Sequence, residues 1–203
     1  MTLLFTDPAS LHPVPEHPGA VPQEPLLNSP LIEAGDSSFY DDPDDPAAFE
    51  SRNVLYHYDS ERLVIDKYCA LGTGARFLMN GANHRMDGTP TFPFLTTGGS
   101  WAEHFDLIFD LSGRGDTDVG NDVGFGNDAA VMPGVRIGHG ALIAADALVT
   151  SGVPPYGIVG SDSARLIRTR CDATDIARLL AVAWWTGLCI TSLSTFGRSC
   201  REL

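Results

Sequence analysis

The sequence predicts a mainly β protein: a left-handed parallel β-helix of hexapeptide repeats, with a long excursion loop and a C-terminal capping α-helix. Residues 119–154 divide into six consecutive hexads whose first and fifth positions are always apolar, and the same frame occurs over residues 65–82. A period of six fits neither the 3.6-residue period of an α-helix nor the simple alternation of a strand. It is typical of a parallel β-helix, in which each hexad forms one short strand and a turn.

The two apolar positions of each hexad have different roles in such a prism. The first side chain points into the narrow interior and must be large, whereas the fifth lies beside a corner and must be small. In the longer block, the first positions are Val119, Phe125, Val131, Ile137, Ile143 and Val149. The fifth positions are Val123, Ala129, Val135, Ala141, Ala147 and Val153. Gly, Asn and Asp dominate between them, as tight corners require. Cys69 falls on a fifth position of the earlier block, which favours a small core residue over a nucleophile.

Composition changes along the chain predict its organisation. Residues 1–30 are rich in proline without periodicity and are expected to form an extended arm. Residues 31–160 are expected to form the β-helix domain, which begins with an acidic, aromatic stretch whose prolines and aspartates favour turns. Residues 83–118 break the hexad frame and are interpreted as one excursion loop, and loops of this length are usually functional. Residues 161–203 are expected to form a helical cap and a tail.

The C-terminal region contains one amphipathic helix. Residues 172–185 place apolar side chains at helical spacing, and Asp172 is available as the N-cap. We expect this helix to lie across the end of the prism. Trp184 and Trp185 are interpreted as part of its core and not as a ligand platform.

Composition and charge exclude several classes of function. The 203 residues are 43% apolar and 19% charged, as in a soluble globular protein, and the net charge of −13 argues against a nucleic-acid partner. No stretch approaches the ~20 apolar residues that cross a bilayer, and residues 1–30 lack a basic n-region and are not expected to be a secretory signal. The four cysteines show no disulfide framework, which favours reduced thiols in a cytoplasmic protein. No cluster has the spacing of metal ligands, so no metal is expected.

The block NGANHRMDG, residues 80–88, resembles the motif of the xenobiotic acetyltransferases. This family includes the streptogramin A (virginiamycin-type) and chloramphenicol acetyltransferases of the β-helix kind. The resemblance extends from about Ile32 to Trp185 and includes FYDDPDDP, NVLYHY and GDTDVGNDV. It implies a homotrimer with active sites at the subunit interfaces. It also implies that acetyl-CoA lies along the outside of the β-helix and that the excursion loop reaches over a neighbouring site.

His84 is the candidate catalytic residue, because it lies in this motif where the hexads give way to the excursion loop. An imidazole can take a proton from an alcohol at neutral pH as that alcohol attacks a thioester. A histidine considered alone would more often be a surface or structural residue, but the motif favours catalysis.

The resemblance also implies the residues that would bind the two substrates. The acceptor alcohol would contact Tyr40, Asp41, Tyr56, His57, Asn83 and Gly124. Acetyl-CoA would contact Ala144, Ser161, Arg165 and Arg168. An aromatic side chain offers a wide apolar face to a macrocyclic or aryl acceptor. Asp41 could equally be one member of a solvated acidic run, and His57 is a weaker candidate than His84.

Two departures from the family pattern leave the reaction open. Gly124 replaces a tryptophan that the family usually has, and GSDSAR at residues 160–165 replaces GGNPAK. Asp162 would oppose the phosphates of CoA, whereas Arg165 retains a positive charge. Three hypotheses follow. The first is an O-acetyltransferase acting on an antibiotic-like or natural-product acceptor, in resistance or in biosynthesis. The second is a biosynthetic enzyme that uses His84 without CoA, and the third is a non-catalytic trimeric scaffold, which would need no histidine there.

Overall fold

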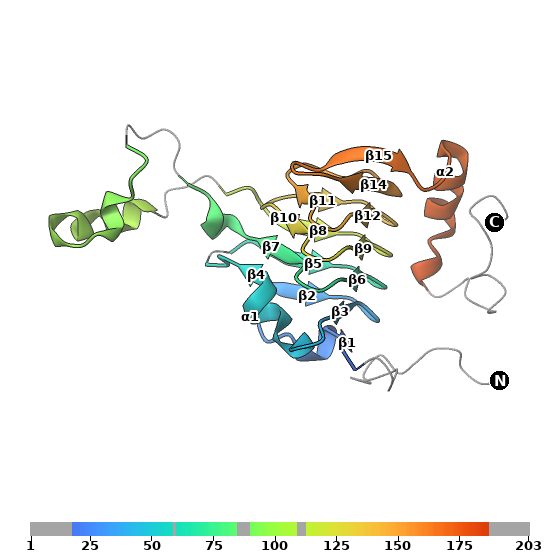
Figure 1. The fold of residues 1–203 in the computed structure, drawn as a ribbon, viewed down its shortest axis with the longest axis horizontal. Helices are drawn as coiled ribbons and strands as arrows, with labels where there is room; N and C mark the ends of the chain where they lie inside the picture. Colours follow the sequence, from blue (N-terminus) through green and yellow to red (C-terminus); the bar gives the residue numbers. More distant parts are fainter. Residues whose placement is uncertain (1–17, 59, 85–89, 109–112, 187–203) are drawn as a thin grey trace.

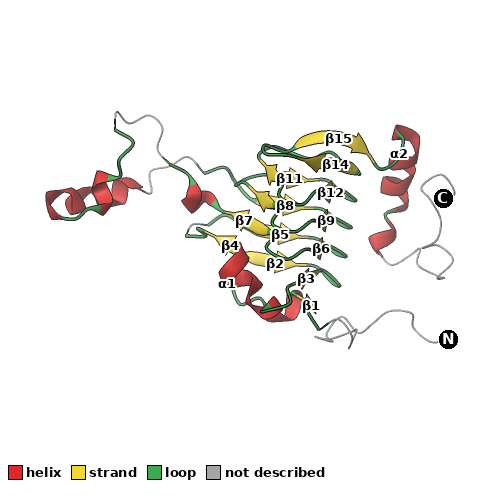
Figure 2. Cartoon of the chain, in the orientation of Figure 1, coloured by secondary structure: helices red, strands yellow, loops and turns green. Residues whose placement is uncertain are grey.

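The computed structural model of the protein describes residues 18–58, 60–84, 90–108 and 113–186. It is a prism of short strands in three sheets, from which one segment projects (Figures 1 and 2). Sheet A has the strand order β1-β3-β6-β9-β12-β14-β15, sheet B the order β11-β8-β5-β2, and sheet C the order β13-β10-β7-β4. The chain enters sheets B, A and C in turn, so each coil of the helix contributes one strand to each sheet.

The strands are only two to five residues long. Sheet A contains β1 (Ala20–Pro22), β3 (Phe39–Asp41), β6 (Ala70–Leu71), β9 (Gly124–Phe125), β12 (Leu142–Ile143), β14 (Gly157–Gly160) and β15 (Arg165–Thr169). Sheet B contains β2 (Ile32–Ala34), β5 (Leu63–Ile65), β8 (Thr117–Val119) and β11 (Arg136–Ile137). Sheet C contains β4 (Val54–Leu55), β7 (Arg76–Leu78), β10 (Ala130–Val131) and β13 (Leu148–Val149). The α-helices are α1 (Phe49–Asn53) and α2 (Ala173–Val182). The 3-10 helices are η1 (Glu24–Leu26), η2 (Pro46–Ala48), η3 (Asn80–Ala82), η4 (Phe94–Thr96), η5 (Gly99–Ile108) and η6 (Trp184–Thr186).

Strand register shows that three hexads make one coil. Val119 pairs in parallel with Ile137, 18 residues later along the chain. Ile65 pairs in parallel with Val119, 54 residues later, which is one coil of 18 residues plus 36 further residues. Residues 83–118 account for this difference, and their described parts include the projecting η4 and η5 (Figure 1). The mainly β class and the parallel sheets were therefore predicted correctly.

The hexad frame also describes the core. Every first-position and fifth-position residue of the longer block is buried. In the earlier block, only Gly81 departs from this pattern, where the chain leaves the prism. Burial raises the pKa of the Cys69 thiol to about 12, so this cysteine has the properties of a core residue and not of a nucleophile.

The backbone at the corners of the prism explains why Gly, Asn and Asp recur between the apolar positions. The fourth residue of seven hexads has a positive φ, which favours Gly, Asn and Asp. These residues are Tyr68, Gly74, Asp122, Asp128, Gly134, Gly140 and Asp146. The tyrosine is the exception in this set, and its ring lies 5.1 Å from that of Trp184, against the C-terminal segment.

Sheet A ends in an antiparallel strand at each edge. β1 pairs antiparallel with β3, and β15 pairs antiparallel with β14. The sequence was expected to form only an extended arm over residues 1–30, but Ala20–Pro22 belong to the sheet. β15 was not predicted either, because neither edge strand follows the hexad frame. Residues 1–17 lie outside the described residues.

The C-terminal helix begins as predicted but lies elsewhere. The Asp172 side chain accepts a hydrogen bond of 2.9 Å from the Asp175 N–H and so caps α2. After α2, the ring of Trp185 stacks on His139 at 4.8 Å, and Leu179 packs with Tyr156. These partners lie along the corner between sheets B and A, so α2 runs beside the prism and not across its end (Figure 1).

Two other expectations concern the cysteines and the membrane. Cys171 is disulfide-bonded, so the expectation of reduced thiols was wrong for this residue. Cys69 is free, and Cys189 and Cys200 lie outside the described residues. Within the described part of the chain, no helix has the length and apolar character needed to cross a bilayer.

Candidate active site

His84 lies at the corner between sheets C and B, where the chain leaves the prism. It follows η3 and is exposed, so its imidazole is accessible to a ligand. Residues 85–88, the rest of the motif, lie outside the described residues. The predicted position of His84 at the start of the excursion loop agrees with the structure.

The Asn80 side chain ties the start of the excursion loop to its return. Its Oδ1 accepts hydrogen bonds from the Arg114 N–H at 3.1 Å and from the Asn83 side-chain amide at 3.2 Å. Asn80 is buried and its partners are not, so these bonds are partly shielded from water. Sequence reasoning gave Asn80 no role, although its place as the first residue of the NGANHRMDG motif could have indicated one. It holds the segment that carries His84 in a fixed relation to the prism.

Tyr56 and Tyr58 lie directly against this segment. The Gly81 N–H donates to the Tyr56 carbonyl at 3.0 Å. A Cβ atom at Gly81 would lie 2.5 Å from Cδ2 of Tyr58, so only glycine fits this close approach. The two tyrosines and the start of the excursion loop therefore form one continuous surface three residues before His84.

A cavity of about 690 Å³ opens beside Tyr56 and Tyr58, in the range of small-molecule sites. Its lining comprises Leu26, Asn28, Ser29, Ile32, Ala47, Glu50, Ser51, Val54, Leu55, Tyr56, His57 and Tyr58. Nε2 of His57 lies 2.7 Å from the Glu61 carbonyl oxygen, so this nitrogen carries the proton and donates. The structure thus brings together Tyr56, His57, Asn83 and His84 at one corner of the prism.

Tyr40 is not available to a substrate, so its assignment as an acceptor-binding residue was wrong. Only 2% of the residue is exposed. Its hydroxyl donates to Oδ2 of Asp42 at 2.8 Å and accepts from the Asn53 amide at 3.0 Å and the Gly74 N–H at 3.1 Å. Burial raises the pKa of Tyr40, and the Asp44 N–H is the main cause that lowers the pKa of Asp42. Tyr40 therefore fixes the first coil.

Replacing Tyr40 with phenylalanine should lower the free energy of unfolding by about 1–3 kcal/mol, because two buried side chains and the Gly74 N–H lose one hydrogen bond each. Denaturant unfolding measures this change. KM for the acceptor should stay within twofold of wild type. A large rise in KM with unchanged stability would instead return Tyr40 to the binding site.

The other acceptor candidates lie on sheet A. Asp41 is exposed at the end of β3. Gly124 is half-buried on β9, where it pairs with Leu142 of β12. A Cβ atom at Gly124 would lie 2.8 Å from Cδ2 of Leu142, so the leucine leans over the place where the family has an indole.

The CoA candidates lie at the last coil of the prism. The Ala144 N–H donates to the Val159 carbonyl at 2.9 Å, and the exposed Ser161 accepts at its carbonyl from the Leu148 N–H at 3.2 Å. A β-bulge between β14 and β15 pairs Arg165 with Gly160 and Arg168 with Ile158. Residues two apart on β14 face the same side, so the bulge directs both arginines to one face of the hairpin.

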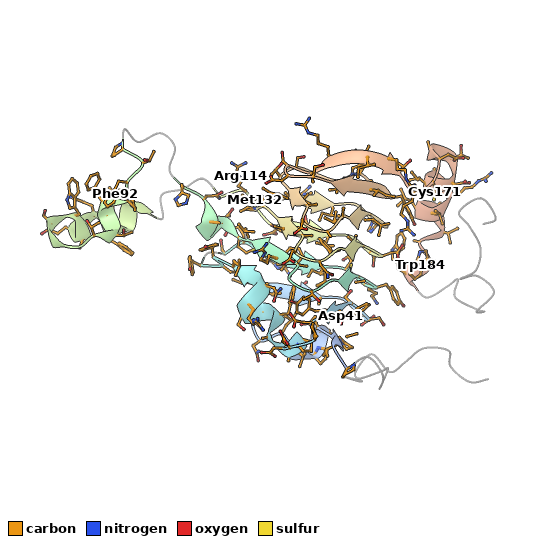
Figure 3. The ribbon with its side chains drawn as sticks, in the orientation of Figure 1. Asp41, Phe92, Arg114, Met132, Cys171 and Trp184 are labelled. Atoms are coloured by element: carbon orange, nitrogen blue, oxygen red, sulfur yellow. The ribbon has the colours of Figure 1, made fainter. Side chains whose placement is uncertain are left out.

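A single chain therefore holds two separate groups of candidate residues. The group at the corner between sheets C and B adjoins the excursion loop, which projects past Arg114 toward Phe92, whereas Trp184 lies on the opposite side of the prism (Figure 3). The second group lies on sheet A and on the hairpin beyond it: Asp41, Gly124, Ala144, Ser161, Arg165 and Arg168. The described residues contain no group of three His, Cys, Asp or Glu side chains that could hold a metal ion.

Comparison with known proteins finds several relatives that are all named acetyltransferases. The chain is 41% identical over 181 residues to a virginiamycin A acetyltransferase of Staphylococcus aureus, covering 88% of this chain and 81% of that protein. It is 40% identical over 162 residues to a chloramphenicol acetyltransferase of Agrobacterium fabrum, covering 78% and 77%. It is also 43% identical over 135 residues to a probable macrolide acetyltransferase of Lysinibacillus sphaericus, covering 66% and 75%. No model of a protein family matches the chain.

The chain also resembles solved structures, at lower sequence identity. A hexapeptide-repeat acetyltransferase of Vibrio cholerae, complexed with acetyl coenzyme A, aligns with a TM-score of 0.48 and 22% identity. The alignment covers 70% of this chain and 62% of that one.

Proposed function

Because the chain belongs to the hexapeptide-repeat family of the chloramphenicol and virginiamycin A acetyltransferases, we propose that it transfers an acetyl group from acetyl-CoA to a hydroxyl group. The acceptor is an antibiotic-like or natural-product alcohol. One observation carries the proposal. The chain is 41% identical to the virginiamycin A acetyltransferase in an alignment that covers 88% of this chain.

His84 acts as the general base in this reaction. Its imidazole takes the proton of the acceptor hydroxyl as the alcohol oxygen forms a bond to the carbonyl carbon of the thioester. The bond between carbon and sulfur then breaks, and the departing thiolate receives the proton from the imidazolium. General-base catalysis of this kind contributes ~100- to 10,000-fold, and holding the two reactants together contributes more.

Arg165 and Arg168 are the residues that would hold the phosphates of acetyl-CoA. Both are exposed, and neither forms an ion pair with another described residue. Two guanidinium groups without a described ion pair on one face of a hairpin suit a phosphate ligand, because a guanidinium can donate parallel hydrogen bonds. Nη1 of Arg168 also donates to the Thr169 carbonyl at 3.1 Å, which leaves its other N–H groups for a ligand. Exposed Asp162 lies in the same turn, and its charge weakens this attraction without removing it.

Calorimetric titration with CoA and acetyl-CoA tests the donor. We expect micromolar binding to the wild type and about 10-fold weaker binding to the Arg165→Ala/Arg168→Ala double variant, since charge-assisted hydrogen bonds are lost. Arg178→Ala is the matched control, because Arg178 is exposed on α2 and already pairs with Asp175. Its affinity should equal that of the wild type.

Different failures of this titration have different meanings. Binding that survives in the double variant would remove the two arginines from the CoA site and leave the acetyltransferase proposal intact. An absence of binding to the wild type at millimolar ligand would contradict the use of acetyl-CoA. It would favour the alternative, a reaction at His84 without CoA.

The finer features of the assembly are part of this proposal. A homotrimer would place the corner group of one subunit beside the sheet A group of its neighbour, which explains why one chain does not unite them. The left-handed sense of the coil and the reach of the excursion loop over a neighbouring site belong with it as expectations from the family. The division into an arm, a β-helix domain and a C-terminal cap is an expectation from composition along the chain, and a cytoplasmic location is an expectation from the cysteines.

A further inference from the structure

The described residues that line the cavity beside Tyr56 and Tyr58 include one carboxylate and no basic residue other than His57. Among them, Glu50 is the only acidic residue, and there is no lysine or arginine. No described lysine or arginine forms an ion pair with Glu50. No described lysine or arginine therefore neutralises the Glu50 carboxylate, in a chain whose net charge is already −13.

The Glu50 carboxylate is held in place by the backbone. Its Oε2 accepts from the Asn28 N–H at 2.7 Å, and its Oε1 accepts from the Ser29 N–H at 3.1 Å. Each oxygen therefore uses one lone pair within the protein and keeps another for a ligand. A fixed carboxylate loses little side-chain entropy when a ligand binds, so it is a pre-organised partner for a cation.

Two tyrosine rings form a second recognition element in the same cavity. The centroids of Tyr56 and Tyr58 lie 6.5 Å apart, and the ring planes meet at 80°. Both residues are exposed, at 49% and 73%, so their faces are open to a ligand. Aromatic faces attract ammonium groups, and pairs of rings set at an angle are the usual means of binding substituted amines.

We propose that this cavity binds a positively charged, substituted amino group of the acceptor. The acceptor is then an amphipathic alcohol with a protonated amine: the amine lies among Glu50, Tyr56 and Tyr58, and the apolar body packs on the half-buried Leu26 and Leu55. This deepens the proposed function and rests on it for the acetyl transfer. The binding of the amine itself requires no catalysis and can be measured alone.

A matched pair of ligands tests the charge directly. We would titrate the full chain with benzyl(2-hydroxyethyl)dimethylammonium and with its neutral analogue in which carbon replaces nitrogen, by calorimetry. The ammonium ligand should bind about 10-fold more tightly, because a carboxylate and two ring faces each contribute modestly at an open site. Equal affinities would overturn the proposal.

Variants then assign the effect to residues. Glu50→Gln should weaken the ammonium ligand about 5-fold and the neutral analogue less than 2-fold. Tyr58→Leu should weaken the ammonium ligand about 3-fold, whereas Tyr58→Phe, which keeps the ring, should not. Glu24→Gln removes an exposed carboxylate outside the cavity and is the control for overall charge. Equal losses for both ligands in Glu50→Gln would show a structural effect and overturn the proposal.

This design separates the inference from the proposed function. Acetyl transfer to neutral alcohols with no preference for the ammonium ligand would overturn the amine site and leave the acetyltransferase. Selective binding of the ammonium ligand without any acetyl transfer would support the amine site and contradict the proposed reaction.

Discussion

Replacing His84 with alanine is expected to lower kcat for acetyl transfer by ~100- to 10,000-fold, the range that a positioned general base contributes. The thermal unfolding temperature should not change, because His84 is exposed beyond η3 and is not part of the core. CoA affinity should also stay at the wild-type value, since the proposed phosphate ligands lie on β15. Steady-state release of free CoA thiol measures kcat, and calorimetry measures the affinity.

His139→Ala is the matched control for this substitution. Nδ1 of His139 accepts from the Asn121 N–H at 2.9 Å, and its ring stacks on Trp185. Its loss should lower stability and leave kcat close to wild type. If His84→Ala kept kcat within tenfold of wild type, His84 would not be the base. The same loss of kcat in both variants would indicate a general structural effect.

Replacing Phe77 with alanine should lower the free energy of unfolding by about 3–5 kcal/mol, the largest effect on stability that we expect from one side chain. Phe77 is fully buried at the first position of a hexad. Its ring centroid lies 6.1 Å from that of Phe49 and 5.5 Å from that of Phe125. These neighbours belong to different levels of the prism, so the cavity left by the ring would weaken the stacking of successive coils.

Urea unfolding at one fixed protein concentration measures this loss, because any oligomer would make stability depend on concentration. Arg76→Ala provides the comparison: Arg76 precedes Phe77 on β7 but is exposed, and a change within about 0.5 kcal/mol is expected. A loss below 1 kcal/mol for Phe77→Ala would mean that inward-facing hexad positions do not determine the stability of the prism.

The interior of the fold was predictable because a coil repeats one physical requirement. A large residue such as Phe125 and a small one such as Ala129 recur at fixed spacing, so periodicity alone identifies which side chains point inward. The edges could not be predicted in this way. β1 and β15 pair antiparallel, and nothing in a period of six specifies where a chain turns back. The position of α2 depends on tertiary contacts such as that between Leu179 and Tyr156, which the periodicity within the helix does not specify.

The candidate site could likewise be predicted only in part. The resemblance to a family located His84, and the interrupted hexads predicted that the residue lies at the start of the excursion loop. Tyr40 was misassigned because an aromatic residue in a matching motif suggests a binding face, whereas burial and three hydrogen bonds decide its role. Glu50 could not be recognised from the sequence, because its place in the cavity depends on the backbone of Asn28 and Ser29.

The register across the excursion loop has a consequence for how such enzymes diversify. Ile65 pairs with Val119 and Leu71 with Phe125, as if the 36 residues between successive coils were absent. The register of the coils does not depend on the length or content of this insert, provided that Asn80 can still accept the hydrogen bond from the returning chain at Arg114. The stacking of the coils and the content of the insert are thereby uncoupled. A lineage can lengthen, shorten or replace the insert while the coils, with His84 at the point where the chain leaves them, keep their register.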